Sequence, residues 1–69
     1  MIAIEELILF MKKGWVAMDE DGDWNWYDHT PFKINIGWVS SEHGIHAYSL
    51  RCFDIKPVED WKTSLRKVG

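Results

Sequence analysis

The apolar residues of "MIAIEELILFMKKG" (1–14) recur at the spacing of an α-helix. The residues of one face stand at i, i+3, i+4 and i+7: Ile4, Leu7, Ile8 and Met11. Two glutamates precede this stretch's centre and two lysines follow it, which suits the helix dipole, and Gly14 suits a C-terminal stop. We therefore expect an N-terminal helix. Its remaining apolar side chains fall outside this face: Ile2, Leu9 and Phe10.

After Gly14 the hydrophobic period changes to two, the spacing of a β-strand. The segments that alternate in this way are 15–18, 24–27, 32–39 and 45–55. Asp21-Gly22 between the first two is a strong hairpin signal, because both residues tolerate positive φ. Polar residues 40–44 form the expected turn before the last strand, which needs a bulge to place its apolar residues. The pattern predicts an antiparallel meander.

The last segment, "KPVEDWKTSLRKVG" (56–69), returns to helical spacing. Pro57 suits the first helical position, and two acidic residues follow it in the first turn. The residues of the apolar face are Val58, Trp61, Leu65 and Val68. The expected fold is therefore α+β: a small four-stranded antiparallel meander flanked by an N-terminal and a C-terminal helix, in a single domain covering 1–69.

The length of the chain and its cysteine content limit the stability and the cellular compartment that we expect. A chain of 69 residues buries only about 60% of its extended surface, so its core gives a thin margin. The one cysteine, Cys52, excludes an internal disulfide and fits a reducing compartment, so we expect the cytoplasm. Cys52 itself is expected as a small core hydrophobe within the last strand. The apolar N-terminus is shorter than the about 20 residues that span a bilayer, so we expect no membrane partner.

The chain has more large apolar side chains than one small core can bury, which indicates self-association. The tryptophans on the predicted strands are Trp15, Trp24, Trp26 and Trp38. One small core face cannot hold them all, so we expect at least one of them to be partly exposed, with Trp24 or Trp26 favoured. The unused helix residues, Ile2, Leu9 and Phe10, predict a homo-oligomer, a dimer or a larger assembly, that buries them between copies.

The charges are unevenly distributed along the chain. A net charge of −3 argues against binding of a nucleic-acid duplex. The predicted hairpin turn carries an acidic tip, which consists of Asp19, Glu20, Asp21 and Asp23. Counted from Asp19, the aspartates fit positions 1, 3 and 5 of a calcium loop, but position 6 is Trp24 and position 12 is Thr30. We interpret the tip as a solvated turn or a contact for a basic partner, with no metal.

The candidate chemistry favours binding over catalysis. Beside the acidic tip, Trp24, Trp26 and Tyr27 could form an aromatic recognition surface. Lys33 and Arg51, on neighbouring predicted strands, could hold a nucleotide that stacks on these rings.

Enzyme chemistry is the weaker alternative. A zinc set would draw on His29, His43, His46 and Cys52. The same Cys52 and His46 could form a nucleophile pair, but a third orienting group and an oxyanion site are missing from the pattern. We expect no catalytic residue and no cofactor.

Two segments resemble a known group of proteins. "WVAMDEDGDWNWYDHTP" (15–31) and "DWKTSL" (60–65) are similar to small uncharacterised phage and prophage proteins with a Trp-rich DxDG hairpin and a C-terminal DWKxSL helix. The resemblance implies an accessory protein made in a bacterial cytoplasm, and it supplies no catalytic residue. It favours a protein that binds and blocks a host anti-phage defence component. The alternative is a homo-oligomeric sponge that sequesters a nucleotide signal.

Overall fold

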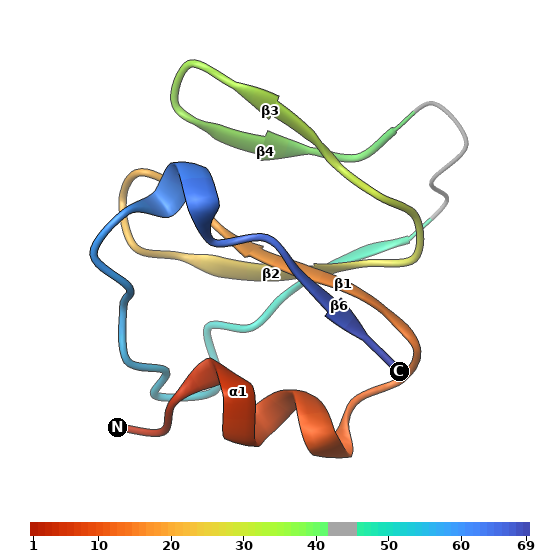
Figure 1. Cartoon of the computed structure of the whole chain (residues 1–69), viewed down its shortest axis with the longest axis vertical. Helices are drawn as coiled ribbons and strands as arrows, with labels where there is room; N and C mark the ends of the chain where they lie inside the picture. The colour runs from red at the N-terminus through yellow and green to blue at the C-terminus, as the bar shows by residue number, and fades with distance from the viewer. Residues whose placement is uncertain (42–45) are drawn as a thin grey trace.

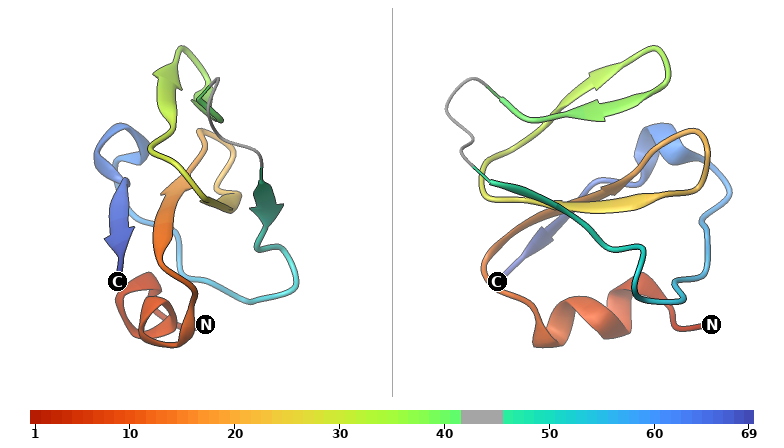
Figure 2. Two further views of the ribbon diagram at one scale, coloured as in Figure 1. Left: turned by 90° about the vertical axis from the view of Figure 1, so that its right-hand side faces the viewer. Right: turned by 180° about the vertical axis from the view of Figure 1, so that it is seen from behind.

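The computed structural model describes residues 1–41 and 46–69. It contains a short N-terminal helix and two antiparallel sheets (Figure 1). The elements in chain order are α1 (Ile4–Leu7), the 3-10 turn η1 (Ile8–Phe10), β1 (Gly14–Met18), β2 (Trp24–Tyr27), β3 (Phe32–Ile34), β4 (Gly37–Val39), β5 (Ala47–Ser49), the 3-10 turn η2 (Trp61–Thr63) and β6 (Arg66–Val68). The larger sheet has the order β5-β2-β1-β6 and the smaller one is the hairpin β3-β4. The larger sheet lies between α1 and this hairpin (Figure 2).

The core forms on the face of the larger sheet that α1 covers. In the β1–β2 register, Val16 stands opposite Trp26 and Met18 opposite Trp24, so all of these side chains share one face. They pack with Ile4 and with apolar residues of later segments, which are Leu50 and Val68. The expected first hairpin is thereby confirmed. At least one strand tryptophan is partly exposed, as expected, but these are Trp15 and Trp38. The choice of Trp24 or Trp26 is wrong, because the two side chains are only 3% and 9% exposed under this cover.

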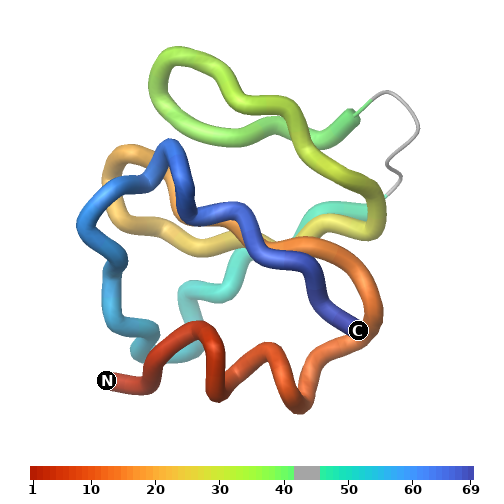
Figure 3. Tube along the Cα trace, viewed as in Figure 1, coloured from red at the N-terminus to blue at the C-terminus, as the bar shows by residue number. Residues whose placement is uncertain are grey.

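The N-terminal helix is confirmed, but it is short. Ile4 and Leu7 are buried, and Ile8 and Met11 pack against the core from its margin. The helix ends because Met11 is extended, with φ −102° and ψ 157°. Before the helix, the chain is held to a later segment. The backbone of Ile2 accepts from Lys56 and donates to Asp54, both at 2.8 Å. The segment after β5 therefore passes beside the N-terminus before it reaches η2 (Figure 3).

The predicted C-terminal helix is wrong. Only the single turn η2 is helical, with the Asp60 side chain accepting from the Lys62 N–H at 3.1 Å. The chain then extends into β6, which pairs antiparallel with β1 from Gly14 opposite Val68 to Val16 opposite Arg66. The physical reason is that β1 has a second edge whose backbone groups need partners. A strand at this edge supplies them and still buries Val68.

The predicted meander is also wrong beyond its first hairpin, because β5 pairs with β2 and β6 with β1, which are not neighbours in chain order, and 32–39 forms a separate sheet. Residues 32–39 form two strands, β3 and β4. The chain turns between them at positions 35–36, since Ile34 pairs with Gly37. Within 45–55 only β5 is a strand, and the start of this segment lies outside the described residues. The chain turns after Leu50, where the Phe53 N–H donates to the Leu50 carbonyl at 3.0 Å. Cys52 lies in this turn and is exposed, so the expectation of a buried thiol is wrong.

Ser64 joins η2 to the end of β1. Its side chain is fully buried, and Oγ accepts from the Met18 N–H at 2.8 Å. The hydroxyl also lies 2.6 Å from the Trp61 carbonyl and 3.1 Å from that of Met18, either of which can accept its proton. A small hydroxyl residue therefore supplies the hydrogen bonds that an apolar residue would leave unmade.

Ser64→Ala should lower the free energy of unfolding by about 1–3 kcal/mol, because the buried Met18 N–H loses its acceptor. Urea denaturation measures this change. The matched control is Thr63→Ala at an exposed neighbouring position, which should change the stability by less than about 0.5 kcal/mol. Equal effects of the two substitutions would contradict the assigned role of Ser64.

Candidate binding surfaces

The acidic tip is the turn between β1 and β2. The Asp19 N–H donates to the Asp23 carbonyl at 2.9 Å, and the Gly22 N–H donates to the Asp19 carbonyl at 3.0 Å. Gly22 has φ +93°, a left-handed conformation that glycine adopts without strain. The Asp-Gly signal in the sequence therefore locates this turn correctly.

The Asp19 side chain connects the tip to the β3–β4 hairpin. Its Oδ1 accepts from the Trp38 N–H at 2.9 Å, and its Oδ2 accepts from Asn25 Nδ2 at 3.4 Å. Gly37 makes the approach possible, because a Cβ at that position would lie 2.5 Å from Asp19 Oδ1. The backbones also meet, since the Glu20 N–H donates to the Ile36 carbonyl at 3.2 Å. Asp19 is thus a structural clamp.

The surroundings of Asp19 shift two pKa values. Burial raises the pKa of Asp19, the carboxylates of Asp21 and Asp23 raise it further, and the hydrogen bond from Trp38 opposes these effects. Burial and the nearby Asp19 charge raise the pKa of Tyr27 to about 12. The Tyr27 hydroxyl donates to the Trp38 carbonyl at 3.2 Å. Tyr27 is buried, so it supports the hairpin and does not present the recognition surface predicted for it.

The other predicted charges are divided between different elements. Asp21 Oδ1 accepts from the Asp23 N–H at 3.0 Å, which orders the turn. Asp23 Oδ2 receives Arg51 Nη2 at 2.9 Å and Nε at 3.2 Å, an exposed pair of a kind that contributes about 0–1 kcal/mol. Lys33 belongs to the smaller sheet, opposite Trp38. The structure therefore does not combine Lys33 and Arg51 into one anion site.

The β3–β4 hairpin exposes one apolar face next to the tip. Phe32 and Val39 are cross-strand partners, and Ile34 follows Phe32 on the same side of its strand. Ile36 in the turn is 68% exposed and lines a shallow hollow of about 230 Å³ with Glu20 and Asp21. We call this the tip surface; it comprises Glu20, Asp21, Phe32, Ile34, Ile36 and Val39. The alternation over 32–39 predicts a single strand, so it does not predict this exposed hairpin face.

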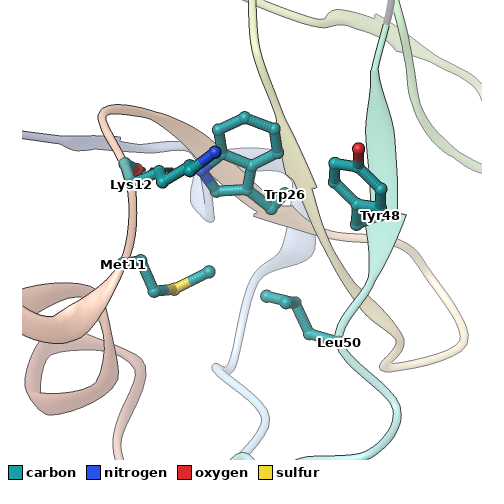
Figure 4. A pocket seen from close by; sticks show the side chains of 5 residues that line it. All are labelled: Met11, Lys12, Trp26, Tyr48 and Leu50. Carbon is teal, nitrogen blue, oxygen red and sulfur yellow. Dashed lines mark hydrogen bonds between the residues drawn. The ribbon is translucent and has the colours of Figure 1, made fainter.

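A second surface feature is an apolar hollow between the end of the N-terminal helical segment and the β2–β5 edge of the larger sheet (Figure 4). It has a volume of about 200 Å³ and is lined by Met11, Lys12, Trp26, Tyr48 and Leu50. We call it the aromatic hollow. The rings of Trp26 and Tyr48 have centroids 5.7 Å apart and are tilted by 32°. Trp26 Nε1 donates to the Lys12 carbonyl at 3.0 Å, which fixes the ring and the lysine backbone together.

Of the residues that line the aromatic hollow, only Trp26 was a predicted site residue. The hollow forms because β5 pairs with β2 and places Tyr48 beside Trp26. His46 then stacks on the outer side of Tyr48, with centroids 5.9 Å apart. A signal for this pairing in the sequence is lacking, since it depends on which strand lies next to β2.

The predicted zinc set draws on side chains in the described part of the chain and on one outside it. Within residues 1–41 and 46–69, no group of three or more His, Cys, Asp or Glu side chains could hold a metal ion. His43, a member of the predicted zinc set, lies outside these residues. Among the same residues, no helix is long and apolar enough to cross a membrane.

The predicted oligomer residues separate into two groups. Leu9 and Phe10 are 78% and 85% exposed at the end of the helical segment. Ile2 is half-buried and forms a parallel bridge with Ile55, so its backbone is already used within the chain. Leu9 and Phe10 therefore remain as an apolar surface of the monomer.

Asp19 should contribute a pH-dependent term to stability. Because its folded-state pKa is raised, its contribution is fully present below the ordinary value and is lost as the pH rises through the raised one. Asp19→Asn keeps an oxygen for the Trp38 N–H without the charge, so its stability relative to wild type should increase from about pH 4 to about pH 7. Thermal melts across this range measure the difference.

Asp19→Ala is the matched comparison, because it removes the acceptor as well as the charge. It should be less stable than wild type by about 1–3 kcal/mol at neutral pH. If the asparagine and alanine variants lose the same stability there, the hydrogen bond to Trp38 does not hold the hairpin.

Comparison with known proteins gives no direct assignment: no protein-family model, no curated protein sequence and no solved structure matches this chain.

Proposed function

We propose that this protein is a non-enzymatic accessory protein of phage type, which binds a host anti-phage defence component in the bacterial cytoplasm and blocks it stoichiometrically. The observation that carries the proposal is the tip surface. It exposes four apolar side chains on one hairpin and adds two carboxylates at its edge, Glu20 and Asp21. Contiguous exposed apolar surface with a polar rim is typical of sites that bind another protein.

The tip surface is already ordered before a partner binds. The Asp19 side chain and the Glu20 backbone tie the hairpin to the tip, at 2.9 Å and 3.2 Å. A surface that is ordered before binding loses less conformational entropy when a partner docks. The carboxylates favour a partner whose apolar pocket has lysine or arginine residues at its rim, since complementary charge speeds and orients docking. Blocking needs no catalytic group, only an occupied surface.

Restored phage growth in bacteria that carry a defence system tests the proposal. Expression of the wild-type protein should raise plaque counts for one system in a panel, and Phe32→Ser with Ile36→Ser should abolish that effect by removing apolar contacts. Lys33→Ser is the matched control, because Lys33 is exposed on the other side of the same strand. The control variant should remain active.

The purified defence protein then decides the stoichiometry. Inhibition should be complete at about one chain per target subunit and should be lost for the doubly substituted variant. Full inhibition at far lower ratios would indicate catalysis and contradict blocking. Equal activity of the tip variant and the wild type would exclude the tip surface.

A second candidate function is the sequestration of a nucleotide signal, and the aromatic hollow favours it. Tyr48 offers an exposed ring on which a base can stack, and the largely buried Trp26 ring beside it is fixed in place. Lys12 at the hollow supplies a positive charge for a phosphate. These groups replace the predicted pair of Lys33, which lies on β3, and Arg51, which lies in the turn after β5.

Titration with cyclic and linear adenine and guanine nucleotides tests this second candidate, with tryptophan fluorescence as the readout. A bound base should quench the fluorescence saturably, and Tyr48→Ala or Lys12→Ala should weaken binding by about 10-fold, equivalent to about 1.4 kcal/mol. Phe32→Ser on the tip surface should leave it unchanged. An unchanged signal up to about 1 mM nucleotide, a concentration that detects even binding of about −4 kcal/mol, would exclude sequestration.

A further inference from the structure

The N-terminal helical segment and the residues that follow it carry their charges in an ordered sequence. Glu5 and Glu6 lie in the first turn of α1, and the exposed Leu9 and Phe10 end η1. Two exposed lysines follow directly where the chain leaves the helix, Lys12 and Lys13. Along the chain the exposed side chains therefore change from acidic to apolar to basic, and Lys12 also lines the aromatic hollow. We call these six residues the helix surface.

The helix surface is the part of the molecule most distant from the tip surface. The two lie at opposite ends of the long axis, with the larger sheet between them (Figures 1 and 2). Among the described residues, the one ion pair to the helix surface is that of Arg66 Nη2 with Glu5 Oε1, at 4.0 Å. This distance is at the limit of an ion pair and the Glu5 side chain is 60% exposed, so Glu5 remains accessible to a second molecule, as do the other charges and the two apolar side chains.

We propose that a second copy of this chain covers the helix surface, with the two helical segments antiparallel about a two-fold axis near Leu9. This symmetry places the acidic start of each segment against the basic end of the other. Glu6 then faces the partner's Lys12, and Glu5 faces the partner's Lys13. Leu9 meets the partner's Leu9 at the axis, and Phe10 packs across it. The same patch serves both copies, as a two-fold interface requires.

Charge decides between this arrangement and a parallel one. A parallel pair would bring the glutamates of both copies together at one end and the lysines together at the other. Like charges in contact across an interface oppose docking, whereas the antiparallel pair matches each charge with its opposite. Exposed ion pairs each add little free energy, so the apolar contact of Leu9 and Phe10 supplies the affinity and the charges set the orientation.

The dimer has a consequence for the proposed function, although the dimer proposal does not rest on that function. Because the helix surface and the tip surface lie at opposite ends, pairing through the helices leaves both tip surfaces accessible. A dimer with two accessible sites can engage two subunits of one oligomeric target, and the second contact forms at a raised effective concentration.

A charge-reversal exchange tests the antiparallel pairing. One variant carries Glu5→Lys and Glu6→Lys, and the other carries Lys12→Glu and Lys13→Glu. Each alone places like charges in contact and should raise the dimer dissociation constant by at least about 10-fold. An equimolar mixture should restore association, as a dimer with one copy of each variant. Analytical ultracentrifugation and native mass spectrometry measure the mass and the composition.

The matched control reverses the same number of charges at the other end of the molecule. Glu20→Lys with Asp21→Lys should leave the dimer unchanged, whereas it should weaken blocking if the tip surface acts as proposed. The failure of one proposal is therefore distinguishable from the failure of the other. Circular dichroism melts show whether each variant is folded.

A disulfide crosslink tests the same antiparallel pairing without depending on the stability of the charge-reversed variants. In a Cys52→Ser background, Leu9→Cys should form a disulfide-linked dimer under mild oxidation, because a residue on the axis meets itself. Glu20→Cys in the same background should not. A wild-type monomer up to about 1 mM, a limit equivalent to about −4 kcal/mol, would overturn the proposal. So would a mixture of reversed variants that stays monomeric, or a Leu9→Cys protein that does not crosslink.

Discussion

Strand β1 is hydrogen-bonded along both of its edges, and the other layers of the molecule are arranged around it. β2 pairs with one edge and β6 with the other, so the hairpin near the N-terminus and the end of the chain become neighbours. Val16 and Ala17, on opposite faces of β1, are fully buried. Both faces are therefore covered, although the chain has only 69 residues. A sheet covered on two sides compensates for the small core expected at this size.

The position of the β3–β4 hairpin depends on a carboxylate that is costly to bury. Asp19 accepts from the Trp38 backbone, and burial together with two neighbouring aspartates raises its pKa. An ionised group in such a place reduces stability, but it fixes the hairpin in one position by hydrogen bonds that an apolar contact would not direct. The tip surface owes its shape to this arrangement. A turn that looks like a solvated acidic loop thus serves as a structural joint.

The molecule separates its two exposed apolar regions in space. One is on the hairpin next to carboxylates, and the other is on the helical segment between acidic and basic ends. Their different charge patterns match the two partners proposed: a target with a basic rim for the first, and an identical copy for the second. This separation is compatible with a protein that associates with itself and with a target at once.

The sequence by itself determined the elements whose signals are local. Helical spacing located α1, alternation located β1 and β2, and Asp21-Gly22 located their turn, since each signal acts between residues close in the chain. The exposed Leu9 and Phe10 also followed from this spacing, as did the acidic tip. Only the tertiary structure decided the rest. The stretch around Val68 has helical spacing but forms β6, because the free edge of β1 supplies hydrogen bonds to an extended chain. In the same way, burial of Trp26 and the position of Tyr48 beside it depend on contacts between distant segments, which periodicity does not encode.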